Sequence, residues 1–223
     1  MRGIFVTGTG TGVGKSVVAG AVCAALARRG ERVAAFKPAV TGLDHPGGEW
    51  PPDHELLAAA ASAGQVPADV APYGFGPPVS PHYAAELAGE AIEPTRLVAE
   101  ARAAGESADA LVCEGVGGLL VPITPGYLVR DLAVDLALPV VVAALTGLGT
   151  INHTLLTVEA ARGVGLRVAG IVLTPWPERP APIERSNRAT VERLAGVPAS
   201  GLPPTEPDAL ADAGEALPID EWL

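Results

Sequence analysis

The sequence predicts an α/β fold in which a parallel sheet is flanked by helices on both faces. Short apolar runs that are typical of buried strands alternate with longer segments whose apolar residues have helical spacing. The chain also opens with a βαβ unit, which runs from the strand expected at 3–7 to the strand expected at 32–37. Apolar residues make up 48% of the chain, which is enough for a core on each side of such a sheet.

The first half of the chain divides at its Gly and Pro residues. A glycine-rich turn at 8–14 follows the first strand, the helix expected next stops at Gly30, and the second strand stops at Pro38. Segments rich in Gly, Pro and polar residues are predicted as loops at 43–52 and 67–80. Helices are predicted at 15–29, at 53–63, and, each with Pro near its start, at 81–89 and 94–104.

The second half continues the alternation of strands and helices. Apolar runs predict strands at 108–113, 139–144 and 167–173. Helical spacing predicts helices at 129–137, 150–163 and 184–194. Beyond residue 196 the chain is rich in Pro, and we expect one last amphipathic piece there.

Composition and charge exclude several classes of protein. No repeat or linker divides the 223 residues, so we expect one domain, residues 1–223. The formal net charge of -10 argues against a nucleic-acid binder, which needs a basic face. The longest apolar run, 136–145, is too short to cross a membrane, and the first residues do not resemble a secretory signal. We therefore expect a cytoplasmic protein with no nucleic-acid or membrane partner, in which Cys23 and Cys113 are reduced core thiols.

The turn after the first strand carries the strongest functional signal. It reads Gly-Thr-Gly-Thr-Gly-Val-Gly-Lys-Ser over residues 8–16 and leads directly into a helix. Backbone N–H groups of small residues and the positive end of a helix form a cradle for phosphates. The residue five before Gly14 is Thr9 rather than Gly, so the loop is a variant of the usual spacing. The candidate nucleotide-binding residues here are Gly12, Val13, Gly14, Lys15 and Ser16.

Lysine usage singles out two candidate catalytic residues. Lys15 and Lys37 are the only lysines of the chain, and every other strongly basic residue is Arg. A compact ammonium at these positions indicates a role that the larger guanidinium does not fill. Lys15 would contact the outer phosphates, while Lys37 ends a strand at the sheet edge where open α/β folds bind ligands.

Three oxygen-bearing side chains are candidate magnesium ligands. Mg²⁺ prefers hard oxygen donors, and the Ser16 hydroxyl stands where this kind of loop holds the ion. Glu114 directly follows a buried strand, where a carboxylate is costly unless something binds it. Asp53 begins a helix, so it is either a helix cap or a third ligand.

Taken in order, these and later motifs resemble those of the dethiobiotin synthetase family. Besides the variant loop, Lys-Pro-Ala-Val-Thr-Gly at 37–42 is similar to the family's lysine–proline motif, and Asp53 is placed as the family's magnesium aspartate is. Pro-His-Tyr-Ala-Ala at 81–85, Glu-Gly-Val-Gly-Gly at 114–118 and Gly-Thr-Ile-Asn-His at 149–153 resemble three further motifs. The matches run from residue 3 to about residue 175.

The resemblance implies a homodimer with a P-loop NTPase-like parallel sheet, and it implies a reaction. An amine of 7,8-diaminopelargonate takes up CO2 to give a carbamate, and the carbamate oxygen attacks the γ-phosphate of ATP, or of another nucleoside triphosphate, with Mg²⁺ as cofactor. The second amine then closes the ring on the mixed anhydride, which releases phosphate and dethiobiotin.

The resemblance also implies substrate contacts. Lys37, Thr11 and Thr41 would face the carbamate or the phosphates, and the Gly117–Gly118 turn would bring backbone close to the substrate. The helix start would hold the substrate carboxylate in the site of the partner subunit, through Thr150, Ile151 and Asn152.

At the nucleotide base the sequence departs from the family. The family often has an adenine-reading Asn after the strand expected at 167–173, whereas this chain has Thr174. The segment Gly201, Leu202 and Pro203 resembles a second loop with which the family contacts the base. Backbone contacts from this segment would select weakly between nucleotide bases. The nucleotide preference is therefore left open between ATP and other nucleoside triphosphates.

Two other interpretations fit parts of the sequence. A cobyrinate-type amide synthase would carry a further glutaminase domain, for which we expect no room in these 223 residues. A non-catalytic nucleotide switch or regulatory domain of the same fold is disfavoured by Gly10, which replaces the early loop lysine of partitioning ATPases, and by the intact charged candidates. Phosphate release that depends on the diamine would separate both from the synthetase interpretation.

Overall fold

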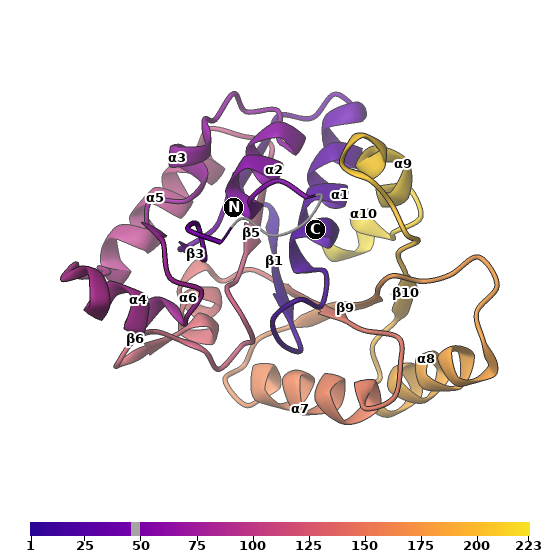
Figure 1. The fold of residues 1–223 in the computed structure, drawn as a ribbon. Helices are drawn as coiled ribbons and strands as arrows, with labels where there is room; N and C mark the ends of the chain where they lie inside the picture. Colours follow the sequence, from indigo (N-terminus) through magenta and orange to yellow (C-terminus); the bar gives the residue numbers. More distant parts are fainter. Residues whose placement is uncertain (46–49) are drawn as a thin grey trace.

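The computed structural model describes residues 1–45 and 50–223, and it contains the expected parallel sheet (Figure 1). All neighbouring strands of this six-stranded sheet are parallel, in the order β10-β9-β8-β1-β5-β2. The strands are β1 (Gly3–Gly8), β2 (Val33–Phe36), β5 (Ala110–Glu114), β8 (Val140–Ala144), β9 (Val168–Leu173) and β10 (Ala199–Gly201).

Both faces of the sheet are covered by helices because its central strands are apolar on both sides. In β1, Phe5 joins the core on one face, while Ile4 and Val6 join the core on the other. One face packs against α1 (Lys15–Arg28), α2 (Asp53–Ala60), α9 (Leu210–Gly214) and α10 (Ile219–Trp222). The other packs against α4 (Pro81–Ala88), α5 (Pro94–Glu106), α6 (Val129–Leu136), α7 (Thr150–Arg162) and α8 (Pro182–Ala195).

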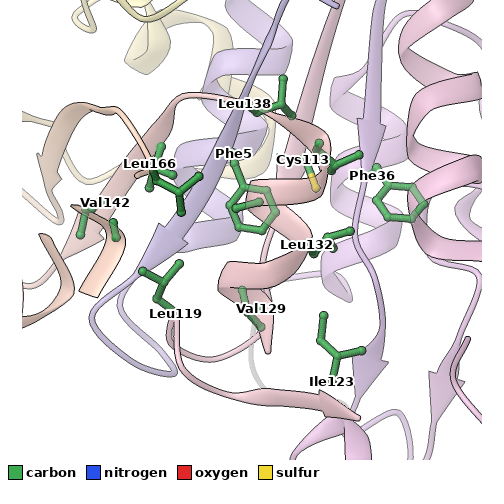
Figure 2. Close-up of a cluster of buried hydrophobic side chains, with 14 of the residues drawn as sticks. Phe5, Phe36, Cys113, Leu119, Ile123, Val129, Leu132, Leu138, Val142 and Leu166 are labelled. Carbon is green, nitrogen blue, oxygen red and sulfur yellow. The ribbon is translucent and has the colours of Figure 1, made fainter. Parts of the chain in front are cut away.

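Aromatic and branched side chains fill the core on the second face (Figure 2). Phe5 and Phe36 come from two strands of the sheet and are fully buried, as is Cys113 from the strand between them. Val129 and Leu132 reach this cluster from α6 and are also fully buried. The two cysteines are free and buried, as the sequence predicts.

The chain reverses its direction across the sheet next to β1. From β1 it crosses β5 to reach the edge strand β2, and from β5 it crosses β1 to reach β8. The loops that follow β1 and β5 therefore leave neighbouring strands at the same edge of the sheet. This is the place where open α/β sheets bind ligands.

Several predicted boundaries were wrong. The segment 67–80, predicted as loop, contains α3 (Pro67–Val70) and β4 (Gly74–Phe75), and β4 pairs with β3 (Val40–Thr41). The chain also has a hairpin of β6 (Pro122–Thr124) and β7 (Tyr127–Leu128), and a 3-10 turn η1 (Pro207–Ala209). Strands of two or three residues show no alternation that a sequence pattern can reveal. Of the loop predicted at 43–52, residues 46–49 lie outside the described residues.

Two side chains after α2 explain why this helix ends at Ala60 rather than at residue 63. The Ser62 hydroxyl accepts a hydrogen bond from the Val33 backbone N–H, with a donor–acceptor distance of 2.8 Å. The Gln65 amide bonds both the N–H and the carbonyl of Ala35, at 2.8 and 2.9 Å. These contacts satisfy the free edge of β2, which a longer helix would leave open.

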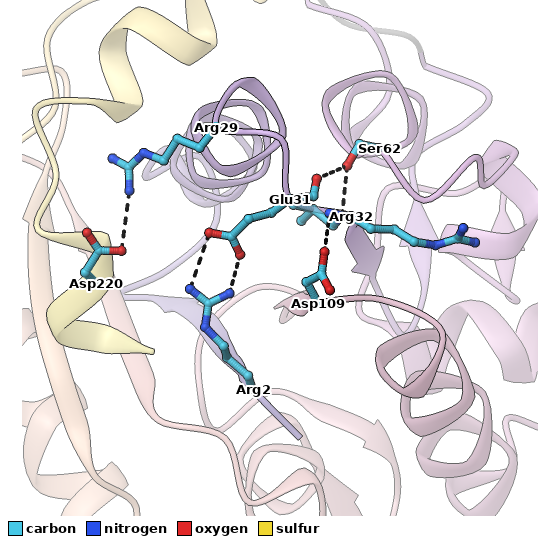
Figure 3. Close-up of polar contacts among 8 residues, drawn as sticks. Arg2, Arg29, Glu31, Arg32, Ser62, Asp109 and Asp220 are labelled. Carbon is cyan, nitrogen blue, oxygen red and sulfur yellow. Dashed lines mark hydrogen bonds and ion pairs between the residues drawn. The ribbon is translucent and has the colours of Figure 1, made fainter.

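Ion pairs tie the C-terminal helices to the end of α1, and Figure 3 shows the one between Arg29 and Asp220. Arg29 pairs with Glu215 at 3.0 Å and with Asp220 at 3.4 Å, and Arg28 also pairs with Glu215. Each pair is partly exposed and therefore contributes little stability by itself. Within residues 1–45 and 50–223, no helix combines the length and the apolar character that crossing a membrane requires.

Candidate active site

A cleft of about 600 Å³ opens at the carboxyl ends of the central strands. The glycine-rich loop after β1 lines one part of it, and Glu114 enters from the end of β5. Lys37 follows β2, and Asp53 begins α2. Four separate elements therefore direct charged or phosphate-binding groups into one space.

The phosphate loop is held in its conformation by close packing. Gly14 has a φ of 86°, in the left-handed region that side chains disfavour. A Cβ on Gly14 would lie 2.6 Å from the methyl carbon of Thr174, so only glycine fits against the segment that follows β9. The chain beyond β9 is thus in direct contact with the loop that begins α1.

Lys15 folds back over the loop that precedes it. Its Nζ donates a hydrogen bond to the Gly10 carbonyl at 2.8 Å, and only 6% of the residue is exposed. Burial lowers the pKa of Lys15, and the neighbouring Lys37 lowers it further against the pull of Glu114. An anionic ligand would therefore offset the burial of this ammonium.

Lys37 lies between the two candidate carboxylates. Its Nζ donates to Glu114 Oε1 at 2.6 Å and lies 2.9 Å from Asp53 Oδ2. The Ser16 hydroxyl donates to the same Glu114 oxygen at 2.9 Å. Glu114 and Lys37 are almost completely buried, while Asp53 is half-exposed at the mouth of the cluster.

The cluster divides its charge unevenly. Burial raises the pKa of Glu114 despite the attraction of Lys37. Burial also disfavours the charged form of Lys37, but the two carboxylates outweigh it and raise its pKa. For Asp53 the effect of burial is outweighed by Lys37, so its pKa is lowered. Lys37 and Asp53 are therefore firmly charged, whereas the Glu114 carboxylate is held at a cost.

The residues fit a magnesium ion. Glu114 Oε2 is buried and has no hydrogen-bond partner among the described residues, although a buried carboxylate oxygen needs one. The other oxygen of Glu114 accepts from the Ser16 hydroxyl as well as from Lys37. Asp53 contacts the same Lys37 ammonium. Hard oxygen donors with net negative charge are the set that Mg²⁺ selects.

The cleft collects most of the candidates named from the sequence. Its lining includes Thr11, Gly12, Gly14, Lys15, Ser16, Lys37, Thr41, Asp53, Glu114 and Gly117. Val13 is instead a core residue. Gly118 belongs to a second hollow of about 460 Å³, which Thr9, Gly10 and His153 also line.

The candidates at the start of α7 and after β9 do not line the cleft of the same chain. Thr150 is buried, and Asn152 is exposed. Thr174 is buried against the phosphate loop. Leu202 is buried in the core. Ile151, Gly201 and Pro203 are also absent from the cleft lining.

Sequence patterns missed one wall of the cleft. It is formed by the turn before α4, with Pro78, Val79, Ser80 and Pro81, and by Trp50. The motif at 81–85 pointed to this segment but gave it no role. A serine immediately before that motif was the available signal.

Two solved structures with a similar fold carry the name ATPase. A ParA family ATPase from Chlorobium tepidum TLS has a TM-score of 0.54 at 14% identity, over 96% of this chain and 89% of that one. The cell division ATPase MinD of Pyrococcus furiosus has a TM-score of 0.54 at 17% identity, over 98% and 90%. At such identities the likeness establishes the P-loop NTPase-like fold alone.

Sequence comparison is more specific. Residues 2–211 match the family model described as an AAA domain. The ATP-dependent dethiobiotin synthetase BioD of Anaeromyxobacter dehalogenans (strain 2CP-1 / ATCC BAA-258) is 46% identical over 93% of this chain and 92% of its own length. The protein of the same name from Bacillus subtilis (strain 168) is 35% identical, over 92% and 87%. With the phosphate loop and the lysine–carboxylate cluster in one cleft, these matches establish that the chain belongs to the dethiobiotin synthetase family.

Proposed function

We propose that this chain closes a cyclic urea on 7,8-diaminopelargonate, with CO2 and Mg²⁺-ATP, through a carbamate and a carbamic–phosphoric anhydride. The observation that carries the proposal is the contact of Lys37 with both Glu114 and Asp53 beside the phosphate loop. Phosphoryl transfer needs concentrated positive charge and a metal site at one point. Family membership supplies the substrate class.

Each group in the cleft has a role in this scheme. The loop at Gly12–Ser16 would hold the phosphates through backbone N–H groups, and Lys15 would leave Gly10 for the outer phosphates. Ser16, Asp53 and Glu114 would hold Mg²⁺, which neutralises charge on the transferring phosphoryl group. Lys37 would stabilise the carbamate as it attacks, with Thr11 and Thr41 beside it.

The substrate carboxylate is assigned to a second copy of the chain. Asn152 is exposed at the first turn of α7, where the Thr150 N–H already donates to the Gly147 carbonyl, and the N–H groups of Ile151 and Asn152 would bind an anion. Leu148, just before this turn, has 95% of its surface exposed, and Leu156 in the same helix has 56%. We therefore propose a homodimer in which Thr150, Ile151 and Asn152, near this apolar surface, complete the partner's site.

The nucleotide base is assigned to the segments after β9 and β10. Thr174 packs against the phosphate loop, and Gly201–Pro203 lies beside it through a backbone hydrogen bond from Trp176 to Leu202 of 2.7 Å. We expect these segments to contact the base through their backbone. Such contacts discriminate weakly between bases, so nucleoside triphosphates other than ATP should also serve as phosphate donors. The active unit is proposed to be the single domain 1–223, acting in the cytoplasm without nucleic acid or membrane.

Phosphate release and product mass test the proposal. The chain is incubated with Mg²⁺ and a panel of nucleoside triphosphates, with and without the diamine and bicarbonate. We expect phosphate release that requires the diamine, chelatable metal and bicarbonate, together with a product one carbonyl heavier than the diamine and lacking two hydrogens. Phosphate release indifferent to the diamine would overturn the proposal.

A further inference from the structure

A serine before α4 has a hydroxyl that its helix does not use. Ser80 occupies the N-cap of α4, where a serine side chain usually accepts a hydrogen bond from a backbone N–H of the first turn. Here the side chain makes no cap bond. The Tyr83 N–H, which a cap would bind, instead donates to the Ser80 carbonyl at 3.1 Å. The hydroxyl is thus free for another role.

The partner of this hydroxyl is an imidazole. Ser80 Oγ lies 3.0 Å from His82 Nδ1, two residues along the chain. Both side chains are half-buried, and the segment is anchored by Pro81, Ala84 and Ala85, which are buried. The pair is therefore held on a rigid element rather than on a free loop.

Ser80 belongs to the wall of the catalytic cleft. Ser80 lines the same cleft as Lys37, Thr41 and Glu114. Its segment is joined to β3 through a hydrogen bond from the Gly42 N–H to the Pro77 carbonyl of 3.1 Å. A substrate beside Lys37 would therefore share its cavity with Ser80, while His82 stands behind Ser80 and does not line the cleft.

The chemistry of a diamine requires acceptors in this cleft. Ammonium and amine groups carry N–H donors, whereas Lys15 and Lys37 are themselves donors only. The Glu114 and Asp53 carboxylates that line the cleft each contact Lys37 through one oxygen, and the proposed magnesium ion would take further carboxylate oxygens. In the His82 tautomer whose Nδ1 carries no hydrogen, the Ser80 hydroxyl donates to Nδ1 and turns its lone pairs to the other side, as an oriented acceptor.

We propose that Ser80 contacts the substrate by accepting a hydrogen bond from an amine of the diamine, and that His82 is a positioning residue that orients the Ser80 hydroxyl. This rests on the proposed function, because the amine belongs to that substrate. Ser80 thereby selects for an N–H donor at this wall of the cleft. His82 acts only through Ser80.

The test compares Ser80→Ala, His82→Ala, His82→Asn and the double variant Ser80→Ala/His82→Ala in steady-state phosphate release. Ser80→Ala should raise the KM for the diamine about tenfold, the size of one well-placed hydrogen bond, with the KM for ATP unchanged. His82→Ala should reproduce this effect. His82→Asn should restore the diamine KM to within about threefold of wild type, because its amide oxygen accepts near the position of Nδ1.

Three outcomes would overturn the proposal. They are an unchanged diamine KM in Ser80→Ala, a double variant with the summed effects of both single changes, or equal changes in the KM for diamine and for ATP. Thermal unfolding distinguishes a loss of packing from the loss of a substrate contact. Ser107→Ala is the matched control, because the Ser107 hydroxyl donates to the Ala104 carbonyl outside the cleft. Wild-type phosphate release is measured first, so a lack of diamine dependence there refutes the proposed function and not the Ser80 contact alone.

Discussion

Lys37 Nζ and Glu114 Oε1 lie 2.6 Å apart in a site where Lys37 is 3% exposed at its side chain and Glu114 is fully buried. The two residues are 77 positions apart in the sequence, and they meet because β2 and β5 are neighbours that end at the same edge of the sheet. Burying both charges costs solvation that their attraction only partly restores. The chain therefore maintains this pair at the expense of stability, as binding sites often do.

Glu114→Gln should stabilise the folded chain while removing activity. Burial raises the pKa of Glu114, so the folded state binds its proton more tightly than the unfolded chain does. Stability is consequently lost as pH rises from the ordinary value of 4.5 through the folded pKa, and the loss is complete above it. The neutral amide avoids this loss and still accepts from Lys37.

We expect the midpoint of thermal unfolding of Glu114→Gln to lie about 2–4 °C above wild type at pH 8, with a smaller gain at pH 5. Phosphate release should fall about 100-fold or more, because a magnesium ligand is lost. Calorimetry at the two pH values checks the first expectation. A variant less stable than wild type at pH 8 would show that the ion pair is net stabilising.

Lys37→Gln should lower both activity and stability, in contrast to Glu114→Gln, which lowers activity alone. It removes the cation that holds both Glu114 and Asp53, and the two carboxylates then repel each other across a buried site. We expect phosphate release to fall about 1,000-fold and thermal stability to drop at pH 8, with recovery towards pH 5 as Glu114 takes a proton. Added Mg²⁺ should restore part of the stability, since it replaces the lost charge. Turnover like that of wild type would remove Lys37 from the mechanism.

The sequence predicts the parts of this site better than their arrangement. The phosphate loop can be predicted because its residues are consecutive in the sequence. The five longer strands of the sheet can be predicted because they are continuous apolar runs. The contact between Lys37 and Glu114 depends on strand order, which no local pattern encodes. The role of Ser80 depends on which of two hydrogen bonds its hydroxyl makes, and a serine before a helix reads as a cap in either case.

Gly201→Ala should weaken nucleotide binding without affecting the diamine. A Cβ at this position would lie 2.3 Å from the Trp176 ring, which packs directly on the glycine and carries the Arg188 guanidinium 5.4 Å from its centre. The displaced indole must also shift the Trp176 backbone, whose N–H donates to the Leu202 carbonyl. We expect the KM for ATP to rise about tenfold and the diamine KM to stay unchanged.

Two further variants sharpen that measurement. Gly126→Ala is the control, because an added Cβ there meets nothing within 4 Å. Adding Trp176→Ala to Gly201→Ala removes the collision and should recover part of the ATP affinity. If Gly201→Ala binds ATP as wild type does, the loop at 201–203 does not contact the base.

Mixing two impaired variants tests whether the start of α7 serves a second subunit. Asn152→Ala leaves the cluster around Lys37 intact, while Lys37→Gln leaves Asn152 intact. Each variant alone should turn over poorly, Asn152→Ala through a raised diamine KM. In a mixed dimer, one of the two sites combines an unaltered Lys37 with an unaltered Asn152 from the other chain. With random exchange of subunits at equal amounts, activity at limiting diamine should recover to about a quarter of wild type, since half the dimers are mixed and each has one complete site. Activity that remains the mean of the two separate samples, after exchange is verified by mass, would place Asn152 at the site of its own chain or outside any site.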